Sequence, residues 1–228
     1  MTPIDRTSRA IGAVLGSAVG DALGAPFEFG PEVAFSARFP KPGGGGEMCG
    51  GGGWDPGEAT DDTQMAVLVG ESLLECGGLE LADIFRRFQR WAVSERVALA
   101  GGDPLDALPG ALDLVHPDHR ARYAVVLAPD WHPDQATEFN GAVWPCLGSA
   151  VWALRTTGSY EGAVRAAVDL GGDTDTVAAV TGGLAGAVYG ADAVPSRWTE
   201  PLHVPLPGFD GRVLRAAELV GLAERLAR

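Results

Sequence analysis

The sequence predicts an all-α protein, and three observations support this fold class. Apolar residues recur three or four positions apart in several segments, which is the spacing of one helix face. Glycine recurs every fourth position in two mainly apolar segments, 12–24 and 182–190. No segment shows a convincing alternating pattern of a strand. With 228 residues, of which 46% are hydrophobic, the chain can form a substantial core, and we expect residues 1–228 to be a single domain.

The first predicted helix begins at Thr7 or Ser8, whose side chains suit a helix N-terminus. One face of this helix has almost no side chains, and the segment 182–190 has a similar face. Such glycine faces cost helix propensity, and close approach of a neighbouring backbone is the usual compensation. We therefore expect the two helices to cross in the centre of the protein at these glycines: Gly12, Gly16, Gly20, Gly24, Gly182, Gly186 and Gly190.

Helical spacing also predicts helices over 60–76, 81–97, 143–155, 160–168 and 212–226. The segment 42–53 is nearly all glycine, so no packed element is expected there. A phosphate-holding loop, a flexible flap and disorder are all open for this segment.

Two separated turns, 60–63 and 173–176, combine carboxylates with hydroxyls just before an apolar helix. Capping a helix N-terminus needs only one such acceptor. Capping alone could explain one of these turns, but it does not explain why both turns carry several carboxylates and hydroxyls. Adjacent carboxylates repel unless a cation neutralises them, and hard oxygen ligands suit Mg²⁺, Ca²⁺ or Mn²⁺. We therefore predict that the turns converge on a binuclear metal site with these ligands: Thr60, Asp61, Asp62, Asp173, Asp175 and Thr176.

Together with the segment 16–29, these turns resemble the ADP-ribosylglycohydrolase family of the dinitrogenase-reductase-activating type. The matching blocks are 16–29, 56–65 and 171–190, and with the helices between them the match covers most of the chain. The resemblance implies a compact orthogonal helical bundle with two divalent ions, Mg²⁺ or Mn²⁺, on the six ligands named above. It also implies that Glu28 covers the metals and contacts the substrate, beside Gly171 and Gly172 as further substrate-binding residues.

The resemblance implies a hydrolase that cleaves the glycosidic bond between an ADP-ribosyl group and its acceptor and releases ADP-ribose. Glu28 and Asp62 are the candidates for the catalytic proton transfer, and the sequence does not choose between them. Two alternatives stay open. One is a non-catalytic ADP-ribose or nucleotide-binding protein of the same fold, and the other is a metal-dependent phosphoesterase.

The sequence departs from the family pattern in its middle part, where a Gly-Asn-Gly segment that helps to hold ADP-ribose is not found. We interpret Asn140-Gly141 as a superficial echo of that segment. Asp21, inside the first helix, is expected to bond backbone groups near the site or to support a metal ligand.

The net charge, the cysteines and the apolar segments limit which partners and which compartment we expect. The net charge of −13 argues against stable nucleic-acid binding and against docking on an anionic membrane. Cys49, Cys76 and Cys146 match no zinc spacing and are expected to be reduced. The sequence begins without a signal-peptide pattern, and no apolar run is expected to form a membrane helix. We expect a cytoplasmic monomer that acts on ADP-ribosylated protein, nucleic acid or small molecules.

Overall fold

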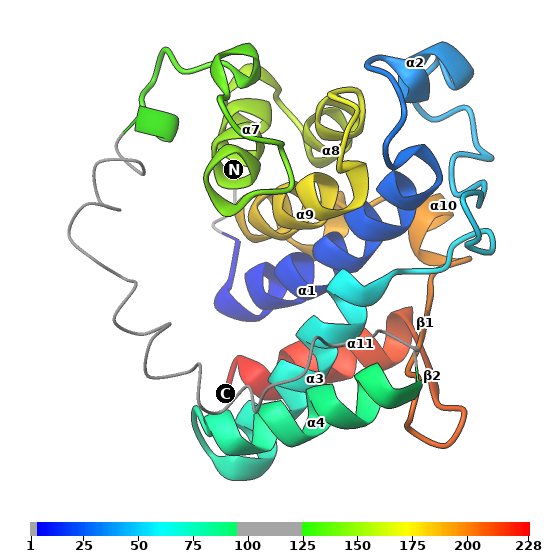
Figure 1. The fold of residues 1–228 in the computed structure, drawn as a ribbon, viewed down its shortest axis with the longest axis vertical. Helices are drawn as coiled ribbons and strands as arrows, with labels where there is room; N and C mark the ends of the chain where they lie inside the picture. Colours follow the sequence, from blue (N-terminus) through cyan, green and yellow to red (C-terminus); the bar gives the residue numbers. More distant parts are fainter. Residues whose placement is uncertain (1–3, 95–124) are drawn as a thin grey trace.

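The computed structural model of the protein describes residues 4–94 and 125–228 (Figure 1). These residues are mainly helical, which confirms the all-α fold class. The longer helices are α1 (Arg6–Gly24), α3 (Asp61–Cys76), α4 (Leu81–Ser94), α7 (Val143–Thr156), α8 (Tyr160–Val168), α9 (Thr174–Tyr189) and α11 (Ala216–Leu226). The shorter elements are α2 (Ala34–Arg38), α10 (Ser196–Thr199) and the 3₁₀ turns η1 (Ala25–Phe27), η2 (Pro133–Gln135) and η3 (Ala191–Ala193).

α1 and α9 pack along each other at the centre of the molecule, with α7 and α8 on one side and α3, α4 and α11 on the other (Figure 1). A Cβ atom at Gly12 would overlap the backbone of Gly186, and a Cβ atom at Gly16 would lie 2.5 Å from the carbonyl oxygen of Gly182. The same overlaps occur in the opposite direction, from α9 toward α1. The predicted crossing of the two helices at their glycine faces is therefore confirmed.

The other helices lie close to their predicted positions. α8 has the predicted bounds, and α3 is followed by Gly77 in the left-handed conformation that closes many helices. α4 is described as far as Ser94, and the rest of that predicted helix lies outside the described residues.

The predicted N-cap of α1 is wrong. Asp5, and not Thr7 or Ser8, is the N-cap, and its Oδ1 accepts the Ser8 N–H at 2.7 Å.

The C-terminal region differs from the prediction, because the helix expected over 212–226 begins only at Ala216. The residues before it form strand β2 (Val213–Arg215), which pairs antiparallel with β1 (His203–Pro205). The register places Val204 opposite Leu214, and both side chains are buried. Three residues per strand are too few to produce a recognisable alternation in the sequence.

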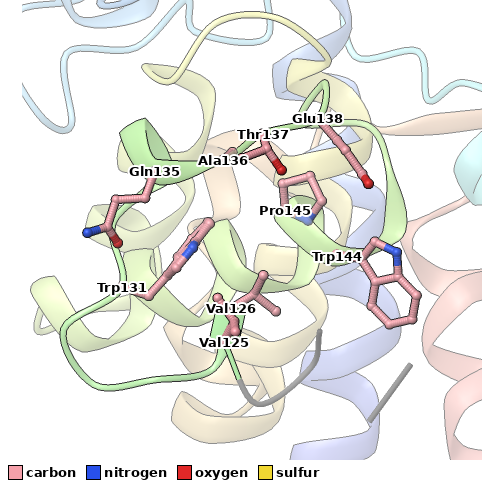
Figure 2. A pocket seen from close by; sticks show the side chains of 9 residues that line it. All are labelled: Val125, Val126, Trp131, Gln135, Ala136, Thr137, Glu138, Trp144 and Pro145. Carbon is pink, nitrogen blue, oxygen red and sulfur yellow. The ribbon is translucent and has the colours of Figure 1, made fainter. Parts of the chain in front are cut away.

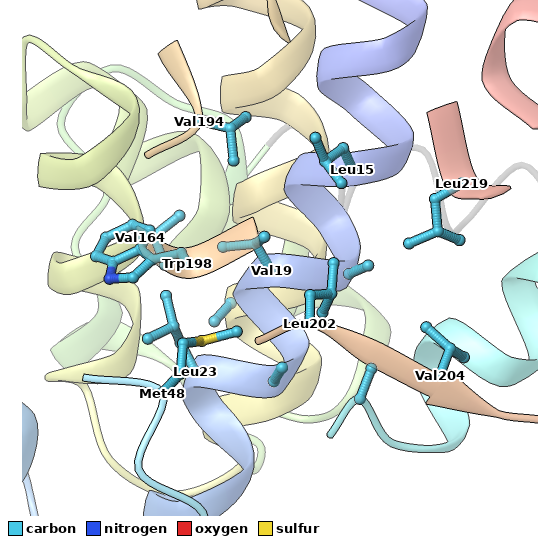
Figure 3. Close-up of a cluster of buried hydrophobic side chains, with 14 of the residues drawn as sticks. Leu15, Val19, Leu23, Met48, Val164, Val194, Trp198, Leu202, Val204 and Leu219 are labelled. Carbon is cyan, nitrogen blue, oxygen red and sulfur yellow. The ribbon is translucent and has the colours of Figure 1, made fainter. Parts of the chain in front are cut away.

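A continuous apolar core surrounds α1 (Figure 3). Tyr160 of α8 is buried in it and donates its hydroxyl to the carbonyl oxygen of Gly16 at 2.7 Å, so the buried ring leaves no phenolic group unpaired. This core is formed by α1, α8, α11, the segment around Met48 and the chain from 194 to 204. Their side chains in Figure 3 include Leu15, Val19, Leu23, Met48, Val164, Val194, Trp198, Leu202, Val204 and Leu219.

The glycine-rich segment 42–53 is anchored by one buried carboxylate. Glu47 is 1% exposed. Its Oε1 accepts from Arg165 Nη1 at 2.8 Å, while its Oε2 accepts from Arg197 Nε at 2.9 Å and from Trp198 Nε1 at 2.6 Å. The segment has no helix or strand, as expected, and its middle part at Glu47 and Met48 is buried in the protein, whereas residues 42–46 are exposed.

Replacing Glu47 with glutamine is expected to lower the free energy of unfolding by about 3 kcal/mol, because the buried Arg165 loses its counter-charge. Urea denaturation of the two proteins measures the difference. Glu224→Gln, on an exposed position of α11, is the matched control and should change stability by less than about 0.5 kcal/mol. Equal effects of the two substitutions would show that Glu47 does not anchor the segment.

Two further expectations can be compared with the structure. Cys49, Cys76 and Cys146 are free, as predicted. The expectation that no apolar run suits a membrane helix is wrong by length and composition, because Arg6–Phe27 meets both criteria. However, 67% of its most apolar window is buried within the protein, and α1 packs there against α9. Core helices of soluble proteins have the same properties.

Candidate active site

The two acidic turns lie together at the N-terminal ends of α3 and α9. Thr176 of α9 donates its hydroxyl to Asp62 Oδ2 of α3 at 3.1 Å. Thr60 is the buried N-cap of α3, and Asp61 is exposed in its first turn. The structure therefore brings all six predicted ligands to one place: Thr60, Asp61, Asp62, Asp173, Asp175 and Thr176.

Glu28, which follows η1, joins this group from a third segment. One carboxylate oxygen from each of Glu28, Asp173 and Asp175 lies within 4.8 Å of the other two. Burial raises the pKa of Glu28, and the negative charges of Asp173, Asp61 and Asp62 raise it further. The structure thus places the predicted catalytic glutamate directly against the predicted metal ligands.

The carboxylates of this cluster repel one another. Burial, followed by the charge of Asp61, raises the pKa of Asp62 to about 6, although the hydrogen bond from Thr176 lowers it. Burial and the neighbouring Asp173 carboxylate also raise the pKa of Asp175. In the described part of the chain, no ion pair within 4.0 Å joins Asp62, Asp173 or Asp175 to a basic side chain. The cluster therefore has no counter-charge from its own described residues.

Both acidic turns are attached to α1. Asp21 is completely buried and accepts from Thr60 N at 3.0 Å, Thr60 Oγ1 at 2.8 Å and Thr63 N at 3.1 Å, as well as from the Thr63 hydroxyl. Burial raises the pKa of Asp21 to about 7 despite these hydrogen bonds. On the other side, Thr174 Oγ1 donates to the carbonyl oxygen of Gly24 at 2.8 Å. The expected bonding of Asp21 to backbone groups near the site is confirmed.

The chemistry of these donors fits hard divalent cations. They are carboxylate and hydroxyl oxygens without sulfur or imidazole, which is the ligand preference of Mg²⁺ and Mn²⁺. The Thr60 hydroxyl already donates its proton to Asp21, so its oxygen lone pairs are available to a cation. A cation would also relieve the repulsion among Glu28, Asp173 and Asp175.

Asn140 is a site residue that the sequence interpretation missed. Its Nδ2 donates to the carbonyl oxygen of Gly171 at 2.8 Å, and its Oδ1 accepts from Asp173 N at 3.0 Å. The neighbouring Gly141 lies so close to Asp173 that a Cβ atom there would overlap the carboxylate. Our interpretation of Asn140-Gly141 as a superficial echo is therefore wrong. Two signals pointed to it: Asn140 is the only asparagine in the sequence, and Asn140-Gly141 matches part of the family's Gly-Asn-Gly segment.

Gly171 and Gly172, the predicted substrate-binding residues, have φ angles of 67° and 69° and form the turn into α9. Phe29 N donates to Gly172 O at 2.6 Å, which connects this turn to the residue after Glu28. Both glycines and Asn140 line a cavity of about 560 Å³. Its lining includes none of the carboxylates of the acidic cluster, so the cavity adjoins the site only through Asn140 and the turn 171–172.

A second, mainly apolar cavity of about 320 Å³ shares Ala136 and Glu138 with the first in its lining (Figure 2). Trp131 and Trp144 lie on opposite sides of this cavity in that view, with Pro145 between them. At the rim of the site, the rings of Phe29 and Phe139 stack with centroids 6.2 Å apart, and both side chains are more than half exposed. Exposed aromatic faces and an apolar cavity are typical surroundings of a small-molecule site.

Replacing Asn140 with alanine is expected to reduce kcat/KM for the reaction proposed below by about 10- to 100-fold, because Asp173 loses the group that orients it. The thermal midpoint should fall only slightly. Steady-state kinetics with a melting curve of the same sample separates the two effects. Thr156→Ala, at the exposed C-terminal end of α7, is the control and should retain full activity. Full activity in Asn140→Ala would contradict this role.

Comparison with known proteins agrees with this geometry. The family model described as ADP-ribosylglycohydrolase matches residues 2–116 and 95–228. The ADP-ribosyl-dinitrogen reductase glycohydrolase of Rhodospirillum rubrum is 28% identical over 86% of this chain and 90% of its own length. An ADP-ribosylarginine hydrolase of Serratia proteamaculans is 24% identical over 85% of this chain and 75% of its own length. A solved structure, an ADP-ribosylglycohydrolase-related protein complex, is 33% identical with a TM-score of 0.67 and covers 98% of each chain.

Proposed function

The chain belongs to the ADP-ribosylglycohydrolase family and is a hydrolase of ADP-ribosyl linkages, and from this premise we propose that it uses two divalent cations to cleave the glycosidic bond between ADP-ribose and an acceptor. The observation that carries the proposal is the convergence of Glu28, Asp173 and Asp175, each offering a carboxylate oxygen within 4.8 Å of the others. Arginine is the acceptor we choose for the test, because two of the relatives are named ADP-ribosylarginine hydrolases.

The proposed cation ligands are those on the two turns: Thr60, Asp61, Asp62, Asp173, Asp175 and Thr176. Two bound Mg²⁺ or Mn²⁺ ions would polarise a water molecule and orient the ribose hydroxyls. An acidic site also stabilises the positive charge that develops at the anomeric carbon in glycoside hydrolysis. The carboxylates of this chain would thus contribute both to holding the ions and to the transition state.

Glu28 is our choice for the residue that transfers the proton. In the described residues, no hydrogen bond or ion pair is recorded for its carboxylate, so it is free to contact a substrate. Asp62, the other candidate, already accepts a hydrogen bond from the Thr176 hydroxyl, and this bond orients the Asp62 carboxylate as a metal ligand. Burial and neighbouring carboxylates raise the pKa of Glu28, a direction that suits proton transfer closer to neutral pH.

The cavity lined by Gly171 and Gly172 is the proposed space for the remainder of the substrate. ADP-ribose carries a diphosphate, and the net charge of −13 gives no general attraction to such an anion. Bound cations and backbone N–H groups would therefore have to offset the repulsion. Phe29 and Phe139 at the rim offer aromatic faces for the adenine.

The test is to incubate the purified protein with ADP-ribosylarginine and Mg²⁺ and to separate the products by chromatography. Release of ADP-ribose that stops in EDTA is the expected result. Formation of AMP or phosphate would instead indicate a phosphoesterase, and binding of ADP-ribose without any product would indicate a non-catalytic binder. Mg²⁺ is also expected to raise the thermal midpoint, because a ligand that binds only the folded state stabilises it.

A further inference from the structure

A second group of ligand-type side chains lies outside the acidic cluster. It consists of Asp55, Glu58 and His203, each with one potential ligand atom within 4.8 Å of the other two. Asp55 and Glu58 belong to the turn that leads into α3, whereas His203 begins β1. Asp55 is exposed and the other two are half-buried, so an ion could reach the group from solvent.

The backbone holds these two segments in register. Glu58 and His203 form a parallel bridge, in which Ala59 N donates to His203 O at 2.9 Å and His203 N donates to Gly57 O at 2.9 Å. Gly57 has a φ angle of 81°, and a Cβ atom at this position would overlap the carbonyl group of Pro201. The close approach that brings the three side chains together is therefore built into the fold.

The carbonyl oxygen of Pro201 fixes the tautomer of the His203 imidazole. Its Nδ1 lies 3.1 Å from the carbonyl oxygen of Pro201, an acceptor that requires the ring proton on Nδ1. This tautomer leaves the lone pair on Nε2. Histidine ligands of metals usually donate their other ring N–H to a carbonyl or carboxylate in this way, which fixes the tautomer and the ring orientation.

The spacing of the group suits a shared ion better than direct pairing. In the described part of the chain, Asp55, Glu58 and His203 take part in no ion pair within 4.0 Å, although their ligand atoms lie within 4.8 Å. Ligand bonds of about 2.0–2.2 Å place two ligands of one ion about 3–4 Å apart. A small movement of the side chains would therefore close the group around one cation.

We propose that Asp55, Glu58 and His203 bind a single divalent transition-metal ion of the Zn²⁺ type, which joins β1 to the turn before α3. Two carboxylates with one imidazole form a donor set that such ions accept, whereas Mg²⁺ prefers oxygen ligands alone. The site is separate from the two-cation centre proposed above and does not depend on it. Its effect would be to stabilise the turn that carries Thr60 and Asp61.

The experiment is a calorimetric titration of the full chain with Zn²⁺, after removal of metals with EDTA and in the presence of excess Mg²⁺. The wild-type protein should bind one Zn²⁺ per chain. His203→Gln should weaken this binding by at least about 100-fold, and Glu58→Gln by about tenfold or more, since both remove a ligand. His132→Gln is the matched control, because His132 is a half-exposed histidine beside a single carboxylate, Asp134.

Two results would overturn the proposal. One is equal Zn²⁺ affinity in the wild type and both ligand variants, and the other is the absence of Zn²⁺ binding by the wild type. Asp175→Asn must retain the Zn²⁺ site, because loss there would assign the bound Zn²⁺ to the acidic cluster. Melting curves recorded without Zn²⁺ establish that each variant is folded, and Glu58→Gln keeps an oxygen to accept from Asp55 N.

Discussion

Asp175→Asn is expected to lower kcat for release of ADP-ribose by about 1,000-fold or more, since loss of metal-assisted catalysis removes several kcal/mol of transition-state stabilisation. Asp175 is 4% exposed and lies within 4.8 Å of the Glu28 and Asp173 carboxylates. Asparagine has nearly the same shape but no charge. Single-turnover kinetics with ADP-ribosylarginine, together with Mg²⁺ titration, measures both the catalytic and the binding defect.

The same substitution should have the opposite effect on stability when no metal is present. Burial and the neighbouring carboxylates raise the pKa of Asp175, so keeping this acidic group in the folded protein costs stability at neutral pH. Asparagine avoids that cost, and Asp175→Asn should therefore melt above the wild type in EDTA and gain nothing from Mg²⁺. Asp192→Asn, an exposed change in η3, is the control and should leave activity and melting unchanged. A variant that still binds two ions and turns over normally would remove Asp175 from the proposed ligands.

Gly186→Leu is expected to prevent folding. A Cβ atom at this position already overlaps the carbonyl group of Gly12 across the crossing of α1 and α9. A leucine side chain must therefore push the two central helices apart. The smaller change Gly186→Ala should cost about 3 kcal/mol or more of unfolding free energy, at the upper end of what overpacking causes. Expression as soluble protein and urea denaturation are the measurements.

Gly183 provides a control on the same helix with an effect of opposite sign. A Cβ atom there would meet its nearest neighbours, Ala13 O and the Ser17 side chain, at 3.6 Å, which is ordinary contact. Gly183→Ala should therefore stabilise the protein by up to about 1 kcal/mol through helix propensity. A loss of stability at Gly183 equal to that at Gly186 would show that the crossing does not depend on the absence of side chains.

Local patterns predicted most of the helices and much of the site. The bounds of α8 and the end of α3 at Gly77 follow from apolar spacing and from a closing glycine. The crossing of α1 and α9 could be predicted because the repeat of four glycines is visible in each helix separately. The acidic turns could be paired because each has more carboxylates than a helix cap needs, and neither carries a basic residue.

The features that sequence reasoning missed depend on contacts between distant segments. Glu47 lies among glycines, and its partners Arg165 and Trp198 are more than a hundred residues away in the chain. Asn140 reaches the site through hydrogen bonds to Gly171 and Asp173, which no local spacing reveals. The strands β1 and β2 are held by their pairing and are too short for a periodic signal.

The attachment of both acidic turns to α1 has a consequence for how this enzyme could diversify. Asp21 and the carbonyl of Gly24 lie about one helical turn apart on α1. The helix α1 therefore sets the distance between the two acidic turns. Segments outside α1 can then change in length or composition without changing the distance between the acidic turns. The preference for one acceptor over another can therefore change during evolution while the geometry of the acidic cluster is retained.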